Sequence, residues 1–163
     1  MTTEDRAHLL HFDYNDAASL HAAADQAKGD LAAVIVTAFC HDMGRDLELP
    51  DPAFARAARE ICDATGAALI LDDVRAGFRL DLGGSWEGIG VRPDLAAYSK
   101  AIANGHALAA VTGSDRFRDG ATRIYTTGSF WCAAVSMAAA VATLSELRRL
   151  GGPAHMRAMG ERF

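Results

Sequence analysis

The heptapeptide AALILDD, residues 67–73, decides the fold. Five apolar residues followed at once by two acids are typical of a buried strand that ends at the edge of a sheet. A helix is expected just before it, over residues 53–65, with Asp51 as N-cap, Pro52 in the first helical position and Gly66 as its stop. A helix that leads directly into a buried strand indicates an α/β protein.

The same alternation of helix and strand extends to both sides of this heptapeptide. Residues 16–28 predict a capped, alanine-rich helix, and residues 31–39 (LAAVIVTAF) predict another buried strand. Further along we expect a glycine-rich stretch over 77–90, strands over 95–99 and 107–111, a helical turn over 115–118, a long apolar helix over 133–150 and the start of another helix over 155–163. This order predicts a three-layer α/β/α domain with a mostly parallel sheet.

Composition excludes several classes of partner. The chain has 163 residues, of which 50% are hydrophobic and 23% charged, which is ordinary for one soluble domain with a core. Its formal net charge is −5 and its basic residues are spread out, so we expect no binding to nucleic acid or to an anionic membrane surface. The longest apolar runs are too short to span a bilayer, and the N-terminus lacks the apolar core of a signal peptide. These features favour the cytoplasm.

Metal and nucleotide sites lack their usual sequence signatures. Cys40, Cys62 and Cys132 are widely spaced with no CxxC, so they predict reduced, mostly buried thiols. The 6 histidines show no HxxxH or HExxH spacing, and no metal is expected. The sequence also lacks GxSxG, Walker A and GxGxxG, which leaves serine hydrolysis and a Rossmann-type nucleotide site without support.

Asp72 is the first candidate for chemistry, because it follows a strand made only of apolar residues. A carboxylate in such a place costs free energy unless it has a cationic or hydrogen-bonding partner. A protonated pyridine nitrogen is one suitable partner, since the ion pair keeps the ring an electron sink. The plainer alternative is an acid that caps the next turn or pairs with Arg75.

Lys100 is the second candidate. Only two of the 16 basic residues are lysines, Lys28 and Lys100, so this chain rarely uses lysine where positive charge alone is needed. Lysine forms imines with aldehydes, and the small neighbours in YSKAIANG (98–105) leave room for a bulky ring. Like Asp72, it follows a predicted strand, where ligands of parallel sheets bind. The plainer alternative is a surface lysine that begins a helix.

Three further residues are candidates for binding anions. Ser129 stands in TTGSFW (126–131), ahead of the long apolar helix, and hydroxyl and free amide groups before a helix can bind phosphate. The simpler interpretation of Ser129 is an N-cap or turn residue. Arg75 and Arg79 suit bidentate binding of a substrate carboxylate, or are solvated like most arginines near glycine loops.

The same segments resemble a known family, the class III, pyridoxal 5′-phosphate (PLP)-dependent aminotransferases. The resemblance is carried by ALILDDVRAGFRLDLGG (68–84), GVRPDLAAYSKAIANG (90–105) and the GSFW…SMAAAVATL helix, with FDYND, GDLAAVIV and FARAAREICDATGA in addition. The FRLDLGG stretch is most similar to glutamate-1-semialdehyde 2,1-aminomutases. The match covers nearly the whole chain in the order typical of the family.

This resemblance implies a fold type I large domain, a homodimer and transamination of a small amino-acid or amino-ketone substrate on PLP. It assigns Asp72 to the pyridine nitrogen and Val74 to one face of the ring. Lys100 corresponds to the lysine of the internal aldimine, which also moves a proton between the substrate α-carbon and the cofactor. Ser129 falls where the family usually has a threonine that reaches the phosphate of the neighbouring subunit's cofactor.

Four segments depart from the usual sequence of the family. Asp73 stands in place of Glu, Thr37-Ala38 in place of Glu-Pro, residues 103–107 in place of glycines and a proline, and residues 131–134 in place of a GNP-like segment. Since Asp72 and Lys100 are kept, these departures bear on the substrate more than on the cofactor.

The resemblance further implies that residues 1–163 are a partial PLP-binding large domain. The N-terminal half, with its phosphate loop, and the C-terminal small domain are expected to be absent. Two alternatives to aminomutase-like chemistry stay open. One is a class III ω-amino-acid transaminase, and the other is a non-catalytic, truncated remnant that only self-associates.

Overall fold

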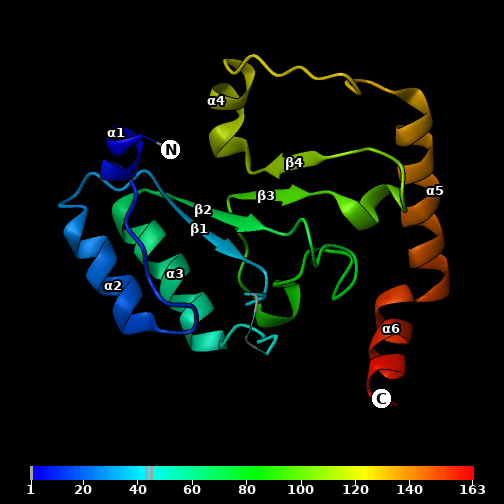
Figure 1. Cartoon of the computed structure of the whole chain (residues 1–163), viewed down its shortest axis with the longest axis horizontal. Helices are drawn as coiled ribbons and strands as arrows, with labels where there is room; N and C mark the ends of the chain where they lie inside the picture. The colour runs from blue at the N-terminus through cyan, green and yellow to red at the C-terminus, as the bar shows by residue number, and fades with distance from the viewer. Residues whose placement is uncertain (1, 43, 45) are drawn as a thin grey trace.

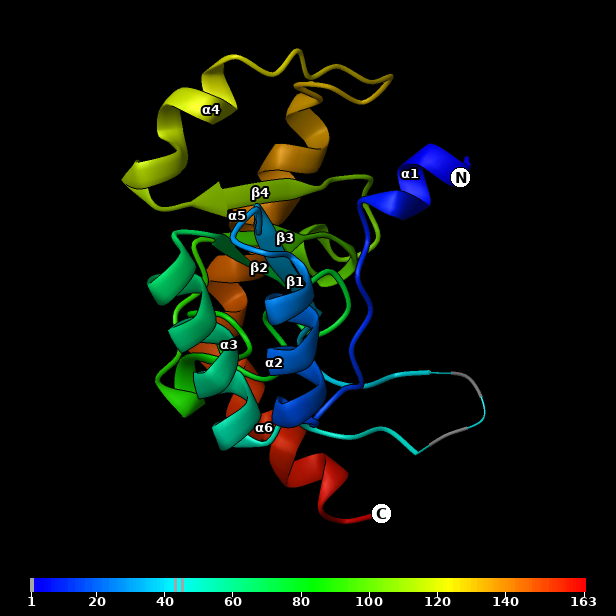
Figure 2. The ribbon, with the colours of Figure 1, turned by 90° about the vertical axis from the view of Figure 1, so that its left-hand side faces the viewer.

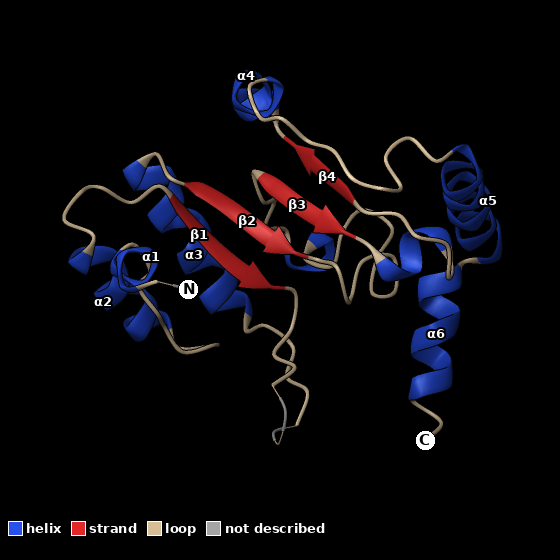
Figure 3. Ribbon diagram, turned by 45° about the horizontal axis from the view of Figure 1, so that its top comes forward, coloured by secondary structure: helices blue, strands red, loops and turns tan. Residues whose placement is uncertain are grey.

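The computed structural model describes residues 2–42, 44 and 46–163. Its centre is an open sheet of four strands in the order β1-β2-β3-β4 (Figure 3). The strands are β1 (Ala33–Thr37), β2 (Ala68–Asp72), β3 (Leu95–Tyr98) and β4 (Ala110–Gly113). β1, β2 and β3 are parallel, and β4 runs antiparallel to β3. The predicted α/β fold with a mostly parallel sheet is confirmed.

The helices follow the expected alternation. The α-helices are α1 (Thr3–Ala7), α2 (Ala17–Gln26), α3 (Pro52–Thr65), α4 (Arg118–Thr122), α5 (Ala134–Leu150) and α6 (Gly152–Gly160). The described residues also form the short 3₁₀ turns η1 (Glu87–Ile89), η2 (Lys100–Ala103) and η3 (Asp115–Phe117). Among the described residues, no helix is long and apolar enough to cross a membrane.

The ends of α3 have the predicted chemistry. The Asp51 carboxylate accepts a hydrogen bond from the amide of Ala53 at 2.6 Å, and Pro52 occupies the first turn, where no amide is needed. Gly66 ends the helix in the left-handed region, with φ of 78°. The chain then turns directly into β2.

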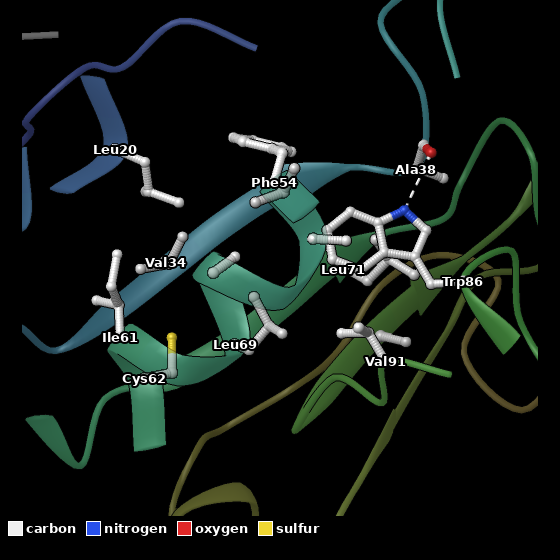
Figure 4. Packing of buried hydrophobic residues seen from close by; sticks show 14 of the residues in the cluster. Leu20, Val34, Ala38, Phe54, Ile61, Cys62, Leu69, Leu71, Trp86 and Val91 are labelled. Carbon is white, nitrogen blue, oxygen red and sulfur yellow. Dashed lines mark hydrogen bonds between the residues drawn. The ribbon is translucent and has the colours of Figure 1, made fainter. Parts of the chain in front are cut away.

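The core lies between the sheet and the helix pair α2 and α3, which pack side by side against one face (Figures 1 and 2). Alternate residues of β1 and β2, such as Val34 and Leu71, are buried against Phe54 of α3 and Leu20 of α2 (Figure 4). Trp86 is 1% exposed and closes this core near the carboxyl ends of the strands.

We call the opposite face of the sheet the open face. The register of the strands and the alternation of side chains along each strand place Ile35, Asp72 and Val111 on it. Ile35 is 63% exposed and Val111 is 73% exposed, so no described helix covers them. α5 packs on η2, and the pair α5 and α6 stands beyond the ends toward which the parallel strands point (Figure 3). Of the three expected layers, the described residues therefore contain the sheet and one helical layer.

Several element boundaries differ from prediction, and one helix was not predicted. The fourth strand begins at Ala110 rather than residue 107, and it is antiparallel because the connection from β3 is too short for a parallel crossover. α6 begins at Gly152 rather than residue 155, since a proline in the first turn is compatible with a helix start. α1 was not predicted, although Thr2 and Asp5 form a capping box that begins it.

Candidate functional site

Asp72 is the last residue of β2 and belongs to the open face. It is half-buried, and its neighbours in register are Thr37 of β1 and Ala97 of β3. The backbone amide of Val74 donates to Asp72 Oδ1 at 3.1 Å, which is the local turn contact favoured by an acid at a strand end. In the described chain no ion pair joins Asp72 to Arg75, so the second oxygen of the carboxylate is available for a cation.

Lys100 follows β3 after a single intervening residue and begins η2. Its side chain is exposed, and its backbone φ of 48° lies in the left-handed region that residues with a side chain rarely adopt. Two anchors hold this conformation. Ile102 and Ala103 are buried against α5, and the Ser99 hydroxyl donates to the carbonyl oxygen of Leu108 at 2.9 Å.

The sheet brings Asp72 and Lys100 to neighbouring strand ends. Asp72 is paired in register with Ala97, three positions before Lys100, in adjacent parallel strands. Carboxyl ends of parallel strands are where α/β proteins bind ligands. A carboxylate fixed by one amide and an exposed primary amine are the two groups required by a cofactor with a basic ring nitrogen and an aldehyde. The donor set therefore fits PLP.

The other two predicted cofactor contacts are placed differently. Val74 is half-buried beside Asp72, and its amide holds the Asp72 carboxylate. Ser129 is exposed in a turn well ahead of α5, whose N-cap is Ala133 without a side-chain hydrogen bond. Ser129 is therefore not the N-cap of that helix, and its contact with phosphate stays a prediction.

Two cavities lie near the sheet. The smaller, about 260 Å³, has an apolar lining that includes Phe39, Leu47 and Leu80, with Arg75 and Arg79 beside them. In the described chain neither arginine makes an ion pair, and carboxylate binding by Arg75 and Arg79 stays a prediction. The larger, about 530 Å³, is lined by neither Asp72 nor Lys100. Four of its strand residues, Leu71, Ala96, Tyr98 and Thr112, belong by register to the helix side of the sheet.

Sequence reasoning missed a buried acid next to the site. Asp73 is 0% exposed, and its carboxylate accepts hydrogen bonds from the amide of Ser85 at 2.9 Å and from the Ser85 hydroxyl. Burial raises the pKa of Asp73, while the hydrogen bonds from Ser85 oppose that rise. Strand alternation was the available signal, because two successive acids at a strand end must face opposite sides of the sheet.

Metal ligation finds no support in residues 2–42, 44 and 46–163. No group of three or more histidine, cysteine or acidic residues gathers there in an arrangement that could hold an ion. Cys40 and Cys62 are buried and Cys132 is exposed, and all three are free thiols.

Comparison with known proteins identifies the family of the chain. The family model "Aminotransferase class-III" matches residues 6–162. An aminopentol aminotransferase from Sphingopyxis macrogoltabida is 49% identical over 144 residues, which are 88% of this chain and 34% of that protein. A glutamate-1-semialdehyde 2,1-aminomutase from Neisseria meningitidis is 36% identical over 147 residues, again 88% of this chain and 34% of that protein.

A solved structure is similar over nearly the whole chain. The FumI protein of Sphingopyxis sp. MTA144, in its PLP internal aldimine form, matches with a TM-score of 0.86 and 47% identity, over 91% of this chain and 36% of that chain. The chain thus spans about a third of the length of the relatives it matches. Because the family model matches almost every residue, this chain belongs to the class III aminotransferases.

Proposed function

We propose that this chain is the cofactor-holding part of a PLP-dependent aminotransferase, in which Lys100 binds the aldehyde carbon of PLP and Asp72 binds its ring nitrogen. The observation that carries the proposal is the position of Asp72 and Lys100 at adjacent carboxyl ends of β2 and β3. Val74 is proposed to pack against the ring, and Ser129 to reach the phosphate held by a second copy of the chain.

Each residue has a defined task in this proposal. Bound PLP supplies an aldehyde that amines attack and a ring that withdraws electrons from the substrate α-carbon. The Asp72 carboxylate, oriented by the amide of Val74, keeps the ring nitrogen protonated. Lys100 would hold the cofactor through its aldehyde carbon, and its amine, when free, would move a proton at the substrate α-carbon.

The relatives support transfer of the amino group between two molecules. Identity is 49% to the aminopentol aminotransferase and 36% to the aminomutase. We therefore propose an aminotransferase, and from the family resemblance we propose a small amino acid or amino ketone as its substrate. The 36% identity keeps an aminomutase, which moves the group within one molecule, as the second candidate.

Cofactor attachment is tested with the two lysines of the chain. PLP is added to the wild-type chain, and the visible absorption band is followed before and after reduction with borohydride. Mass spectrometry should find the reduced adduct on Lys100. Lys100→Arg keeps the positive charge but cannot form the bond, so the band should disappear. Lys28→Arg is the matched control, because Lys28 is exposed just after α2, and it should leave the band unchanged. A band that persists in Lys100→Arg refutes the assignment.

Turnover separates the remaining alternatives. With PLP and an amino donor, an aminotransferase should aminate an added keto acid, whereas an aminomutase should rearrange an amino ketone without one. A folded chain that takes up no PLP would instead match the non-catalytic remnant.

Self-association is part of the proposal. Large apolar side chains are exposed on the open face and along the segment that leads into α5, among them Ile35, Val111, Phe130, Trp131 and Val135. Apolar exposure of this kind marks interaction surfaces, and a second copy of the chain is the proposed partner. Sedimentation velocity should give a dimer, and a monomer at all concentrations would contradict it.

A further inference from the structure

The loop between β2 and η1 is tied back to the sheet at both of its ends. At one end the amide of Asp73 donates to the carbonyl oxygen of Ala97 at 3.0 Å, on the neighbouring strand β3. At the other end Ser85 donates to the buried Asp73 carboxylate through its amide, at 2.9 Å, and through its hydroxyl. The fully buried Asp73 therefore joins the two ends of the loop through its own backbone and side chain.

Trp86, which follows Ser85, links the loop to Ala38, the residue directly after β1. The indole nitrogen of Trp86 donates to the carbonyl oxygen of Ala38 at 3.1 Å (Figure 4). The amide of the same Ala38 donates to the carbonyl oxygen of Asp72 at 3.1 Å. A continuous path of hydrogen bonds and covalent neighbours thus runs from Asp73 through Ser85 and Trp86 back to the backbone of Asp72.

Packing leaves the loop little freedom to move away. A side-chain carbon on Gly77 would lie 2.7 Å from the carbonyl oxygen of Asp73 and 2.7 Å from the Tyr98 ring, so the backbone approaches β3 as closely as a glycine permits. Asp72 and Asp73 are adjacent on one strand end and face opposite sides. Because the two residues share a peptide bond, a displacement of the buried Asp73 also moves Asp72.

We propose that the Asp73–Ser85 pair is a clasp that positions Asp72: it fixes the backbone at the end of β2 so that the Asp72 carboxylate is held toward the ring nitrogen of the cofactor. Asp73 and Ser85 are positioning residues, because neither belongs to the open face. The link to the cofactor rests on the proposed function, whereas the link to Asp72 rests on the geometry alone.

Amide hydrogen exchange in the cofactor-free chain tests the clasp directly. Ser85→Ala removes one hydroxyl, and the amides of Ala38 and Val74, which hold Asp72, should then exchange about fivefold faster, as expected for loss of one hydrogen bond. Asp73→Ala should have a larger effect at the same two amides, and Asp73→Asn, which can still pair with Ser85, should restore part of the protection. Glu87→Gln is the matched control, because in the part of the chain that the structure describes this exposed acid forms an ion pair with the exposed Arg92 alone, at 3.4 Å, and the change should affect neither amide.

The cofactor gives the second readout. The dissociation constant of PLP should rise about fivefold in Ser85→Ala, and the pH midpoint of the visible band of the Lys100 adduct should shift, with Glu87→Gln unchanged on both counts. Uniform acceleration of all amides together with an unchanged affinity for PLP would show a merely structural role and overturn the proposal. Unchanged exchange at Ala38 and Val74 in Ser85→Ala would also overturn it. If the wild-type chain takes up no PLP, the proposed function fails and the exchange experiment alone decides the clasp.

Discussion

Asp94 is the acid that sets the register between β2 and β3, so its removal is the most informative perturbation of the scaffold. One carboxylate oxygen, Oδ2, accepts from the amide of Leu69 at 2.8 Å and from the guanidinium of Arg59 at 2.9 Å. The amide of Asp94 donates in return to the carbonyl oxygen of Leu69 at 2.8 Å. This pair begins the ladder that ends with Asp72 opposite Ala97.

Asp94→Ala is expected to lower the free energy of unfolding by about 2–4 kcal/mol. A buried amide left without an acceptor costs roughly 1–3 kcal/mol, and breaking a buried ion pair costs roughly 3–5 kcal/mol. The second figure must be reduced here, because the Arg59 side chain is 19% exposed and keeps Asp63 at 2.9 Å. Adding Arg59→Met to Asp94→Ala removes the guanidinium that has lost its partner. The free energy of unfolding of the double variant should therefore fall by less than the sum of the two single losses.

Urea unfolding followed by circular dichroism measures these losses, with an unchanged slope confirming that the same surface is exposed. Asp63→Ala is the matched control. Asp63 is the other acid paired with Arg59, and its side chain is 65% exposed. Its removal should lower the free energy of unfolding by less than about 0.5 kcal/mol. Equal losses for Asp94→Ala and Asp63→Ala would refute the reasoning, since burial would then not distinguish the two acids.

Three further outcomes follow from single residues. Because burial raises the pKa of Asp73, the folded chain holds that proton at pH values where the unfolded chain has lost it. Stability should therefore fall as pH rises from the ordinary aspartate pKa through the raised one, and Asp73→Asn should remove this dependence in urea titrations at several pH values. Gly77→Ala should cost about 1–3 kcal/mol in the same assay, because its added carbon would lie 2.7 Å from two atoms, whereas Gly88→Ala, with open space around it, should be nearly neutral. A thiol reagent counted by mass spectrometry should modify one cysteine, Cys132, in the folded chain and all three in denaturant, and rapid labelling of Cys40 or Cys62 would contradict their burial.

Local chemistry explains which parts of the fold were predictable. The boundaries of α3 follow from Asp51, Pro52 and Gly66, each of which acts on its own backbone or on residues within one turn. β2 was predicted because a short apolar run that ends in two acids is typical of a buried strand that reaches the edge of a sheet. Asp72 and Lys100 could be proposed as a pair for the same reason, since each directly follows a recognisable strand.

Contacts between distant residues explain what was missed. Ser85 lies twelve positions beyond Asp73, and the carbonyl oxygen that accepts from Trp86 lies 48 positions before it. Neither pairing has a local sequence signal, because the glycine-rich loop between Asp73 and Ser85 can close in many ways before tertiary packing selects one. The antiparallel direction of β4 differs in kind, because it follows from the short connection between β3 and β4 and not from a distant contact.

Two constraints on Asp72 are therefore separable in space and in mechanism. Asp94 acts at the start of β3 and sets which residues of β2 and β3 are opposite each other, so it governs the distance along the strands between Asp72 and Lys100. The Asp73–Ser85 clasp acts at the other end and sets how firmly the last peptide of β2 is held. A register error moves both candidate groups, whereas a loosened clasp moves only the acid. Loss of Asp94 should consequently weaken both the proposed attachment of PLP at Lys100 and the proposed contact of Asp72 with the ring nitrogen, while loss of Ser85 should weaken only the contact with the ring nitrogen.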